Sequence, residues 1–198
     1  MSSRLRGARF GVGIGLIVAA AVIGVLLLNG DDDSGDSGDS GLTSPAATTS
    51  PDASTSPPAH GPELASLDRL RGLPDLTGHP VYWAGEQSGD YELTVASDGS
   101  VFIRYLPEGV PVGSREVTSL TVATYPYVNA FATLESAAKQ PDATRDETPD
   151  GGLVVGNEAN PNTVYVAFPD VDLQIEVYDP EAGRALELAT AGEIEPIE

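Results

Sequence analysis

Residues 91–106 read YELTVASDGSVFIRYL, and this stretch decides the fold because it predicts a β-hairpin. Apolar and polar residues alternate over 91–96, and a second strand-like run follows over 101–106. Between the two runs, Asp98-Gly99 is a strong signal for a hairpin turn. The stretch therefore predicts two antiparallel strands that bury one face.

The same alternation selects the register of the hairpin. A two-residue loop would place Arg104 opposite Leu93, on the apolar face. A three-residue loop with Gly99 left-handed places Arg104 opposite Glu92 and keeps the apolar side chains together. We prefer this register because a slip of one residue moves every side chain to the other face. Arg104 is then expected to form a cross-strand ion pair, and anion binding is its alternative role.

The rest of residues 63–198 extends this pattern into one α+β domain. Strands are expected at 80–84, 119–124, 153–156, 163–168 and 173–178, with a four-residue loop between the last two. Helices are expected at 64–73, at 126–139, and from Pro180 to a C-cap at Gly192, while the polar stretch 141–152 is expected to be a mobile loop. Short turns join neighbouring strands, so the sheet should be mostly antiparallel, with about two helices packed on one face.

The composition is acidic and lacks cysteine. The chain of 198 residues has a net charge of −20, with +3 in residues 1–29, −6 in residues 30–62 and −17 in residues 63–198. Nucleic acid is excluded as a partner because binding its phosphates needs clustered Lys and Arg. The lack of cysteine excludes disulfides, thiolate metal sites and thiol nucleophiles.

Residues 10–28 form an uncharged, mostly apolar run of 19 residues. A helix of that length is about 28 Å long, close to the hydrocarbon thickness of a bilayer. Residues 1–9 carry three arginines and Asp31–Asp33 follow the run, which predicts a cytoplasmic N-terminus. The run therefore predicts a single-pass helix in the cell membrane with the C-terminal domain outside the cytoplasm. A cleaved signal peptide is the alternative, although no Ala-x-Ala follows the run.

Small residues recur at every fourth position near the start of this segment. They are Gly7, Gly11, Gly15 and Ala19. On a helix they form one ridge, which lets two helix backbones approach closely. The pattern predicts a homodimer through the membrane helix; the alternative is that small residues are simply common in such helices.

Residues 29–62 are rich in Asp, Ser, Gly, Thr and Pro and show no apolar periodicity. Such a segment cannot bury enough apolar surface to fold, so it is predicted to be a disordered linker. The linker would hold residues 63–198 away from the bilayer. O-glycosylation of its Ser/Thr/Pro tract is a further hypothesis.

The sequence contains no catalytic, metal or cofactor signature. His79 is the single histidine of residues 63–198, which argues against a zinc site and a nucleophilic triad. No glycine-rich phosphate loop or dinucleotide fingerprint occurs. Carboxylates are abundant, so a glycosidase pair stays open. Tyr82 and Trp83 are candidates for a sugar-stacking platform, although a single Trp belongs more often to a core.

Five short motifs of the domain are distinctive. They are Tyr82-Trp83-Ala84-Gly85, Tyr91-Glu92-Leu93-Thr94, Asp98-Gly99, Arg104-Tyr105-Leu106-Pro107 and Thr124-Tyr125-Pro126. With these motifs, most of residues 78–196 resembles membrane-anchored envelope proteins of actinobacteria that have no assigned function. The resemblance implies a bacterial origin and an envelope location. It implies no activity, because none of the motifs is a catalytic signature.

Together these features predict a membrane-tethered extracytoplasmic domain that binds an envelope protein or a wall glycan and is not an enzyme. The candidate ligand-binding residues are Tyr82, Trp83 and Arg104. Two alternatives stay open. One is a carboxylate-dependent enzyme acting on cell-wall glycans, and the other is an extracytoplasmic sensing module that works through a membrane partner.

Overall fold

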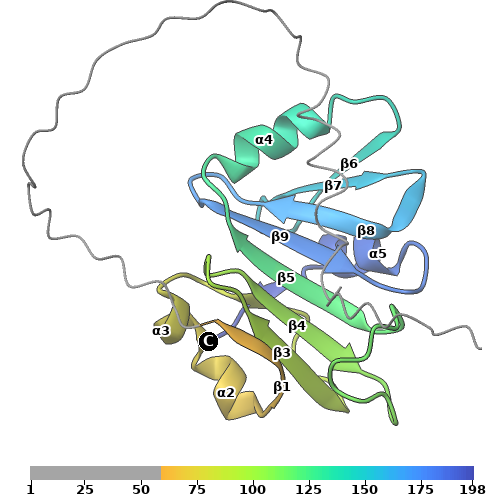
Figure 1. Cartoon of the computed structure of the whole chain (residues 1–198). Helices are drawn as coiled ribbons and strands as arrows, with labels where there is room; N and C mark the ends of the chain where they lie inside the picture. Colours follow the sequence, from red (N-terminus) through yellow and green to blue (C-terminus); the bar gives the residue numbers. More distant parts are fainter. Residues whose placement is uncertain (1–58) are drawn as a thin grey trace, which may run out of the picture.

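A computed structural model describes residues 59–198, which form a large antiparallel sheet with helices on both faces (Figure 1). The strands are β1 (His60–Ala65), β2 (Tyr82–Trp83), β3 (Asp90–Val95), β4 (Val101–Leu106), β5 (Leu120–Pro126), β6 (Ala143–Glu147), β7 (Leu153–Asn157), β8 (Asn160–Ala167), β9 (Leu173–Tyr178) and β10 (Glu195–Pro196). The helices are α2 (Leu67–Arg71), α3 (Leu73–Thr77), α4 (Ala130–Ala137) and α5 (Arg184–Ala191).

Eight of these strands form one sheet in the order β1-β3-β4-β5-β9-β8-β7-β6, and each neighbouring pair is antiparallel. The strands β2 and β10 pair separately. The predicted α+β class with a mostly antiparallel sheet is confirmed.

The β3–β4 hairpin adopts the predicted register. Its ladder pairs Tyr91 with Tyr105, Glu92 with Arg104, Leu93 with Ile103, and Val95 with Val101. Gly99 has a φ of 87°, which is the left-handed conformation that the three-residue loop requires. Asp98 fixes the turn because its side chain accepts a hydrogen bond from the Ser100 N–H at 2.9 Å. The alternation of apolar residues was therefore sufficient to select the register.

The β8–β9 hairpin also forms as predicted. Val164 pairs with Val177 and Val166 with Ile175, which leaves residues 169–172 as the loop. The side chains of these pairs belong to the main core, which lies on the face of the sheet that α5 covers.

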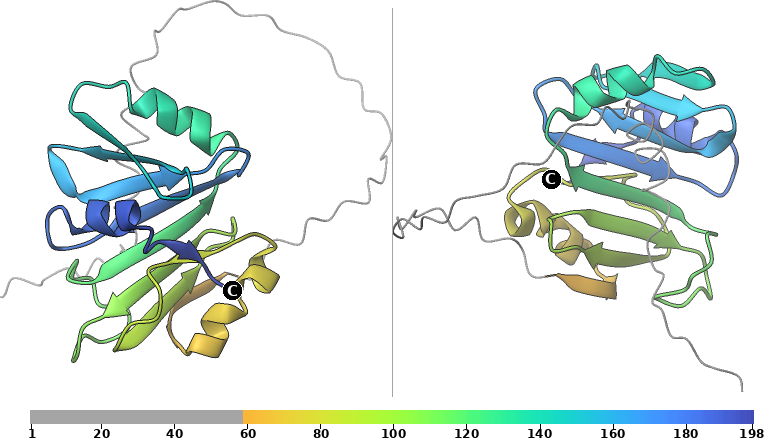
Figure 2. Two further views of the ribbon diagram at one scale, coloured as in Figure 1. Left: turned by 180° about the vertical axis from the view of Figure 1, so that it is seen from behind. Right: turned by 45° about the horizontal axis from the view of Figure 1, so that its top comes forward.

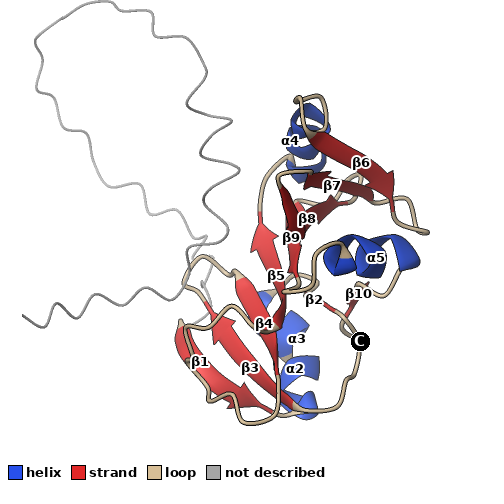
Figure 3. Cartoon of the chain, turned by 90° about the vertical axis from the view of Figure 1, so that its right-hand side faces the viewer, coloured by secondary structure: helices blue, strands red, loops and turns tan. Residues whose placement is uncertain are grey.

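The helices cover both faces of the sheet, so the prediction that two helices pack on one face was wrong. The main core contains buried residues of α2, α3 and α5, together with Leu93, Ile103 and Val177 of the sheet. We call this side the α5 face. A second core joins α4 to Val155 and Tyr165, which point to the opposite side, and we call that side the α4 face. Figures 2 and 3 show α2, α3 and α5 together on one side of the sheet.

The segment 60–77 differs from the predicted helix over 64–73. It forms the edge strand β1 and then two short helices, α2 and α3. The Ser66 hydroxyl accepts a hydrogen bond from the Arg69 N–H at 3.2 Å, so Ser66 caps α2 and the residues before it pair with β3. Pro74 follows the predicted helix directly and lies in the first turn of α3, where a missing N–H costs no helical hydrogen bond.

The stretch 141–152 is not the predicted mobile loop throughout. Residues 143–147 form β6, which pairs with β7 at the edge of the sheet. Apart from Ala143 its residues are polar, and most are exposed, because an edge strand needs no apolar face when its backbone is paired on one side. The sequence of β6 therefore lacks the alternation of apolar and polar residues that would have predicted a strand.

The two long helices are shorter than predicted. In place of 126–139, α4 spans 130–137, because Pro126 is the last residue of β5 and residues 127–129 form a turn. Likewise α5 begins at Arg184 and not near Pro180. Its predicted C-cap is confirmed: Gly192 is left-handed, with a φ of 77°.

Residues 1–58 lie outside the described part of the chain. The predictions that fall there concern the cytoplasmic segment 1–9, the membrane helix 10–28, most of the linker 29–62, and the self-association residues Gly7, Gly11, Gly15 and Ala19. Because β1 begins at His60, residues 60–62 belong to the sheet. No helix within residues 59–198 is long and apolar enough to cross a membrane.

Candidate functional site

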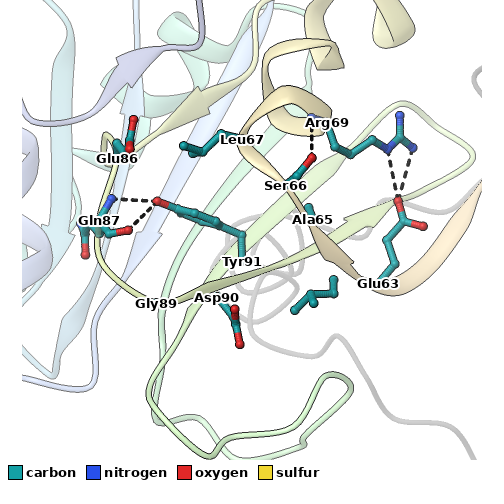
Figure 4. Close-up of a pocket in the computed structure, with 11 residues that line it drawn as sticks. Glu63, Ala65, Ser66, Leu67, Arg69, Glu86, Gln87, Gly89, Asp90 and Tyr91 are labelled. Atoms are coloured by element: carbon teal, nitrogen blue, oxygen red, sulfur yellow. Dashed lines mark hydrogen bonds and ion pairs between the residues drawn. The ribbon is translucent and has the colours of Figure 1, made fainter.

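An open groove of about 790 Å³ lies beside β1, at one edge of the sheet (Figure 4). One wall is formed by the end of β1 and the start of α2, and the other by the loop before β3 and the first residues of β3. The walls meet where Ala65 pairs with Tyr91 in the β1–β3 ladder.

Local hydrogen bonds fix both walls of the groove. On one side, the Ser66 cap turns the chain sharply from β1 into α2. On the other, the Gln87 N–H donates to the Tyr91 hydroxyl at 2.8 Å, and that hydroxyl donates to the Gln87 carbonyl at 2.8 Å. The Gln87 side chain also donates to the Ala84 carbonyl at 3.1 Å. Hydrogen bonds between residues that line the groove therefore fix its shape.

The lining of the groove has an excess of negative charge. It contains the carboxylates of Glu63, Glu86 and Asp90 and one guanidinium, that of Arg69. Arg69 lies 3.3 Å from Glu63, and Arg71 outside the groove lies 3.7 Å from Glu86. Among the described residues, Asp90 forms no ion pair. The groove is suited to a group that carries positive charge or amide donors.

The structure places Tyr82 and Trp83 in the main core, away from this groove. Each is only 8% exposed. The Tyr82 ring stacks on Phe168 with 5.6 Å between the ring centroids, and its N–H donates to the Thr124 hydroxyl at 3.0 Å. Burial raises the pKa of Tyr82, and the charge of Asp150 adds to the shift. Neither ring presents a face on which a sugar can stack.

Arg104 forms the predicted ion pair with Glu92, at 2.7 Å between the side chains. Its remaining donors bind the carbonyls of Ser114 and Glu116, at 3.0 and 3.1 Å. Glu92 in turn accepts a hydrogen bond from the Gly113 N–H. The pair therefore fastens the loop 107–119 over the α4 face, and the guanidinium has a structural role in place of anion binding.

A third arrangement surrounds Glu176, which sequence reasoning did not single out. Glu176 lies in β9 on the α4 face and is 5% exposed. The Tyr125 hydroxyl donates to its Oε2 atom at 2.7 Å. Burial raises the pKa of Glu176, while the hydroxyls of Tyr125 and Tyr165 act in the opposite direction. Burial also raises the pKa of both tyrosines, and the nearby Glu176 charge adds to each shift.

Several buried oxygens of this arrangement have no hydrogen-bond partner among residues 59–198. They are Glu176 Oε1, the Tyr165 hydroxyl and the Thr163 hydroxyl, all on β8 and β9. Tyr165 is the residue directly opposite Glu176 in the ladder. An unpartnered buried polar atom costs free energy, so these oxygens are a local source of instability in the α4 face.

In the described part of the chain, His79 has a structural position and no metal-ligand cluster is present. The His79 ring nitrogens lie 2.8 Å from the Pro80 carbonyl oxygen and 3.0 Å from that of Gly99, so the ring links two turns. Within residues 59–198, no three acidic or histidine side chains gather as metal ligands would.

Sequence reasoning missed the groove because one of its walls was assigned to a helix. Ser66, followed by Asp68 in the first turn, is an N-cap signal that would have started the helix at Leu67 and left β1 outside it. No comparable signal marks Glu176. Alternation within 173–178 separates two faces, but it does not reveal that β9 is a central strand.

Comparison of the chain with protein-family models, with curated proteins and with solved structures gives no match. The resemblance to actinobacterial envelope proteins therefore stays a prediction.

Proposed function

We propose that the chain is a membrane-tethered, non-enzymatic binding protein whose extracytoplasmic domain binds a segment of an envelope protein. Support for the tether comes from the apolar run 10–28, the arginines before it and the polar linker after it. The binding site is the groove between β1–α2 and residues 86–91.

The observation that carries this proposal is the open, acidic groove itself. It is preformed, because the Ser66 cap and the Tyr91–Gln87 hydrogen bonds hold its two walls. Its side chains are accessible: Glu63 and Glu86 are 40% and 60% exposed. Complementary charge guides encounter and favours specific partners. A partner segment with Lys or Arg and backbone amide groups fits this lining.

A protein segment is favoured over a glycan because the domain offers no exposed aromatic ring. Sugar rings commonly stack on aromatic faces, yet every Tyr, Trp and Phe within residues 59–198 is buried or half-buried. Tyr91, the aromatic residue of the groove, is 6% exposed. A wall glycan would therefore have to bind through polar contacts alone.

A binding role is also favoured over a glycosidase. Retaining and inverting enzymes need two carboxylates that face each other across the substrate. Glu176 has a raised pKa, but the groups that act on it are tyrosines and not a second carboxylate. In the groove, Glu63 and Glu86 are each paired with an arginine and not with a second carboxylate.

Photocrosslinking in whole cells tests the proposal. A photoreactive amino acid at Leu64, which is 61% exposed and lines the groove, should give one specific protein adduct. The same amino acid at Val128, which is 72% exposed and outside the groove, should not give that adduct. Since the recognition is electrostatic, Glu86→Arg with Asp90→Arg should remove most of the adduct.

The matched charge control is Glu158→Arg, because Glu158 is exposed and lies in the β7–β8 turn, far from β1 in the strand order. It should leave the Leu64 adduct unchanged. The same adducts at Leu64 and Val128, or no effect of the groove reversals, would contradict the groove as the binding site. An adduct that a muramidase shortens would identify a glycan ligand and refute the protein partner.

A further inference from the structure

Glu176 occupies the junction between the two halves of the sheet. Strands β1, β3, β4 and β5 form one half and β6 to β9 the other, and the halves meet where β5 pairs with β9. Glu176 in β9 lies opposite Ala123 of β5 on one side and Tyr165 of β8 on the other. Its side chain therefore contacts both halves.

The hydrogen bonds at this junction are incomplete. Tyr125 of β5 donates to Glu176 Oε2 at 2.7 Å, across the boundary between the halves. Glu176 Oε1 and the Tyr165 hydroxyl are buried and form no hydrogen bond of full geometry among the described residues, although Tyr165 lies close enough to lower the pKa of Glu176. A carboxylate with one donor is poorly compensated in a buried site, whereas a neutral carboxyl group carries an O–H donor of its own.

The titratable groups around Glu176 do not supply a positive charge. Tyr125 faces it from β5 and Tyr165 from β8. Asp98, in the β3–β4 turn, acts on Tyr125 and adds negative charge. The helix α4, which packs on β8, carries Glu135 as its one charged residue. Arg145 of β6 shares the cross-strand row of Glu176, but it lies beyond Tyr165 and Val155 and is exposed. Arg104 lies in the next row, where Glu92 pairs with it.

We infer that protonation of Glu176 controls how firmly the two halves of the sheet are held together. The neutral form stabilises the β5–β9–β8 junction, and ionisation loosens it by leaving a negative charge buried between two phenols. This effect of Glu176 protonation is independent of the groove, because Glu176 does not line the groove.

The direction of the pH dependence follows from the raised pKa of Glu176. In the unfolded chain the carboxyl ionises near its ordinary pKa of 4.5, while the folded state keeps its proton to higher pH. The contribution of Glu176 to stability is then complete below pH 4.5 and is lost as the pH rises through the folded pKa. Between the two pKa values the unfolding equilibrium constant should rise about tenfold per pH unit from this one proton.

Urea unfolding of the full chain in neutral detergent micelles between pH 4 and pH 9 tests the inference. The fluorescence of Trp83, the single Trp and a buried one, reports unfolding. Relative to Glu176→Gln, the wild-type chain should lose stability as the pH rises. Tyr125→Phe removes a donor to the carboxylate and so raises the folded-state pKa of Glu176, which should extend this loss to higher pH.

The matched control is Glu158→Gln, at an exposed site, which should keep the wild-type pH dependence. Parallel stability curves for the wild type and Glu176→Gln would overturn the inference. If Glu176→Gln does not fold, NMR titration of the Glu176 carboxyl group in the wild-type chain tests the inference instead. A Glu176 pKa clearly above 4.5 supports the inference, and a value at or below 4.5 refutes it.

Discussion

Arg104 illustrates how a single residue holds a long loop in place. Its side chain is 18% exposed and that of its partner Glu92 is 3% exposed, so the ion pair is largely withdrawn from water. Its further bonds reach the loop 107–119 at Ser114 and Glu116. Removing one partner of such a pair leaves an uncompensated charge, which is the costly way to break it.

We therefore expect Arg104→Met to lower the free energy of unfolding by about 3 kcal/mol. Urea unfolding measures this change. The loop should also become more sensitive to trypsin after Arg115, an exposed residue whose side chain has no hydrogen bond or ion pair among those of residues 59–198. Adding Glu92→Leu should recover part of the loss, because no buried charge then stays unpaired. A loss below about 1 kcal/mol would show that the pair is no more than an ordinary surface ion pair.

Gly152 is constrained by space and not by backbone conformation. A Cβ atom at this position would lie 2.6 Å from Phe168 Cε1 and 2.8 Å from the Thr148 hydroxyl. Phe168 is 9% exposed and stacks on Tyr82, so the ring cannot easily move away.

Gly152→Ala should therefore destabilise the domain by about 1 to 3 kcal/mol through overpacking. Thermal or urea unfolding provides the measurement. Gly61→Ala is the control, because a Cβ there has no neighbour within 4 Å, and it should change stability by less than about 0.5 kcal/mol. Equal effects of the two substitutions would mean that the crowding at Gly152 relaxes freely.

At the scale of elements, the helix α4 packs over β7 and β8 on the α4 face of the sheet. Leu134 is 4% exposed and packs with Val155 and Tyr165 in the second core. This core is small, so the loss of one leucine leaves a large fraction of it empty. Leu134→Ala should cost about 2 to 5 kcal/mol, and Leu64→Ala, at a position 61% exposed, should cost less than about 0.5 kcal/mol. Similar costs for both would place α4 away from the sheet in solution.

The elements that could be predicted are those whose signals are local. In the β3–β4 hairpin, alternation and the Asp98-Gly99 turn act within 16 residues, and together they determine each pair. The strand β6 has no such signal, because its partner supplies only backbone hydrogen bonds. The side of the sheet on which α4 lies depends on how β5 joins β9 across 46 residues, and no local pattern encodes that pairing.

The same distinction explains what was missed in the candidate sites. The ion pair of Arg104 could be predicted because its partner Glu92 lies in the same hairpin. The groove needs β1 beside β3, and the Glu176 arrangement needs β5, β8 and β9 side by side. Both are products of long-range pairing, so single residues such as Asp90 and Glu176 look like ordinary solvated acids in the sequence.

At the scale of the whole molecule, the acidity of the domain fits the proposed arrangement. Residues 63–198 carry a charge of −17, which repels an anionic lipid surface. In that arrangement, the proposed linker would separate this charge from the bilayer. A domain held off the membrane keeps the groove beside β1 accessible to other envelope proteins.

The proposed layout predicts that the chain behaves as an integral membrane protein. Alkaline carbonate should leave it in the vesicle pellet, because residues 10–28 are long enough to span the hydrocarbon. Val18→Arg with Val22→Arg places two charges near the centre of this run, at about 2.5 to 3.5 kcal/mol each, and should move the chain to the supernatant. The control Val117→Arg, at a position 61% exposed in the domain, should stay in the pellet. Protease added outside spheroplasts should cut the linker and release residues 59–198. Wild-type chain in the carbonate supernatant, or a linker cut only after lysis, would contradict an anchor with the domain outside.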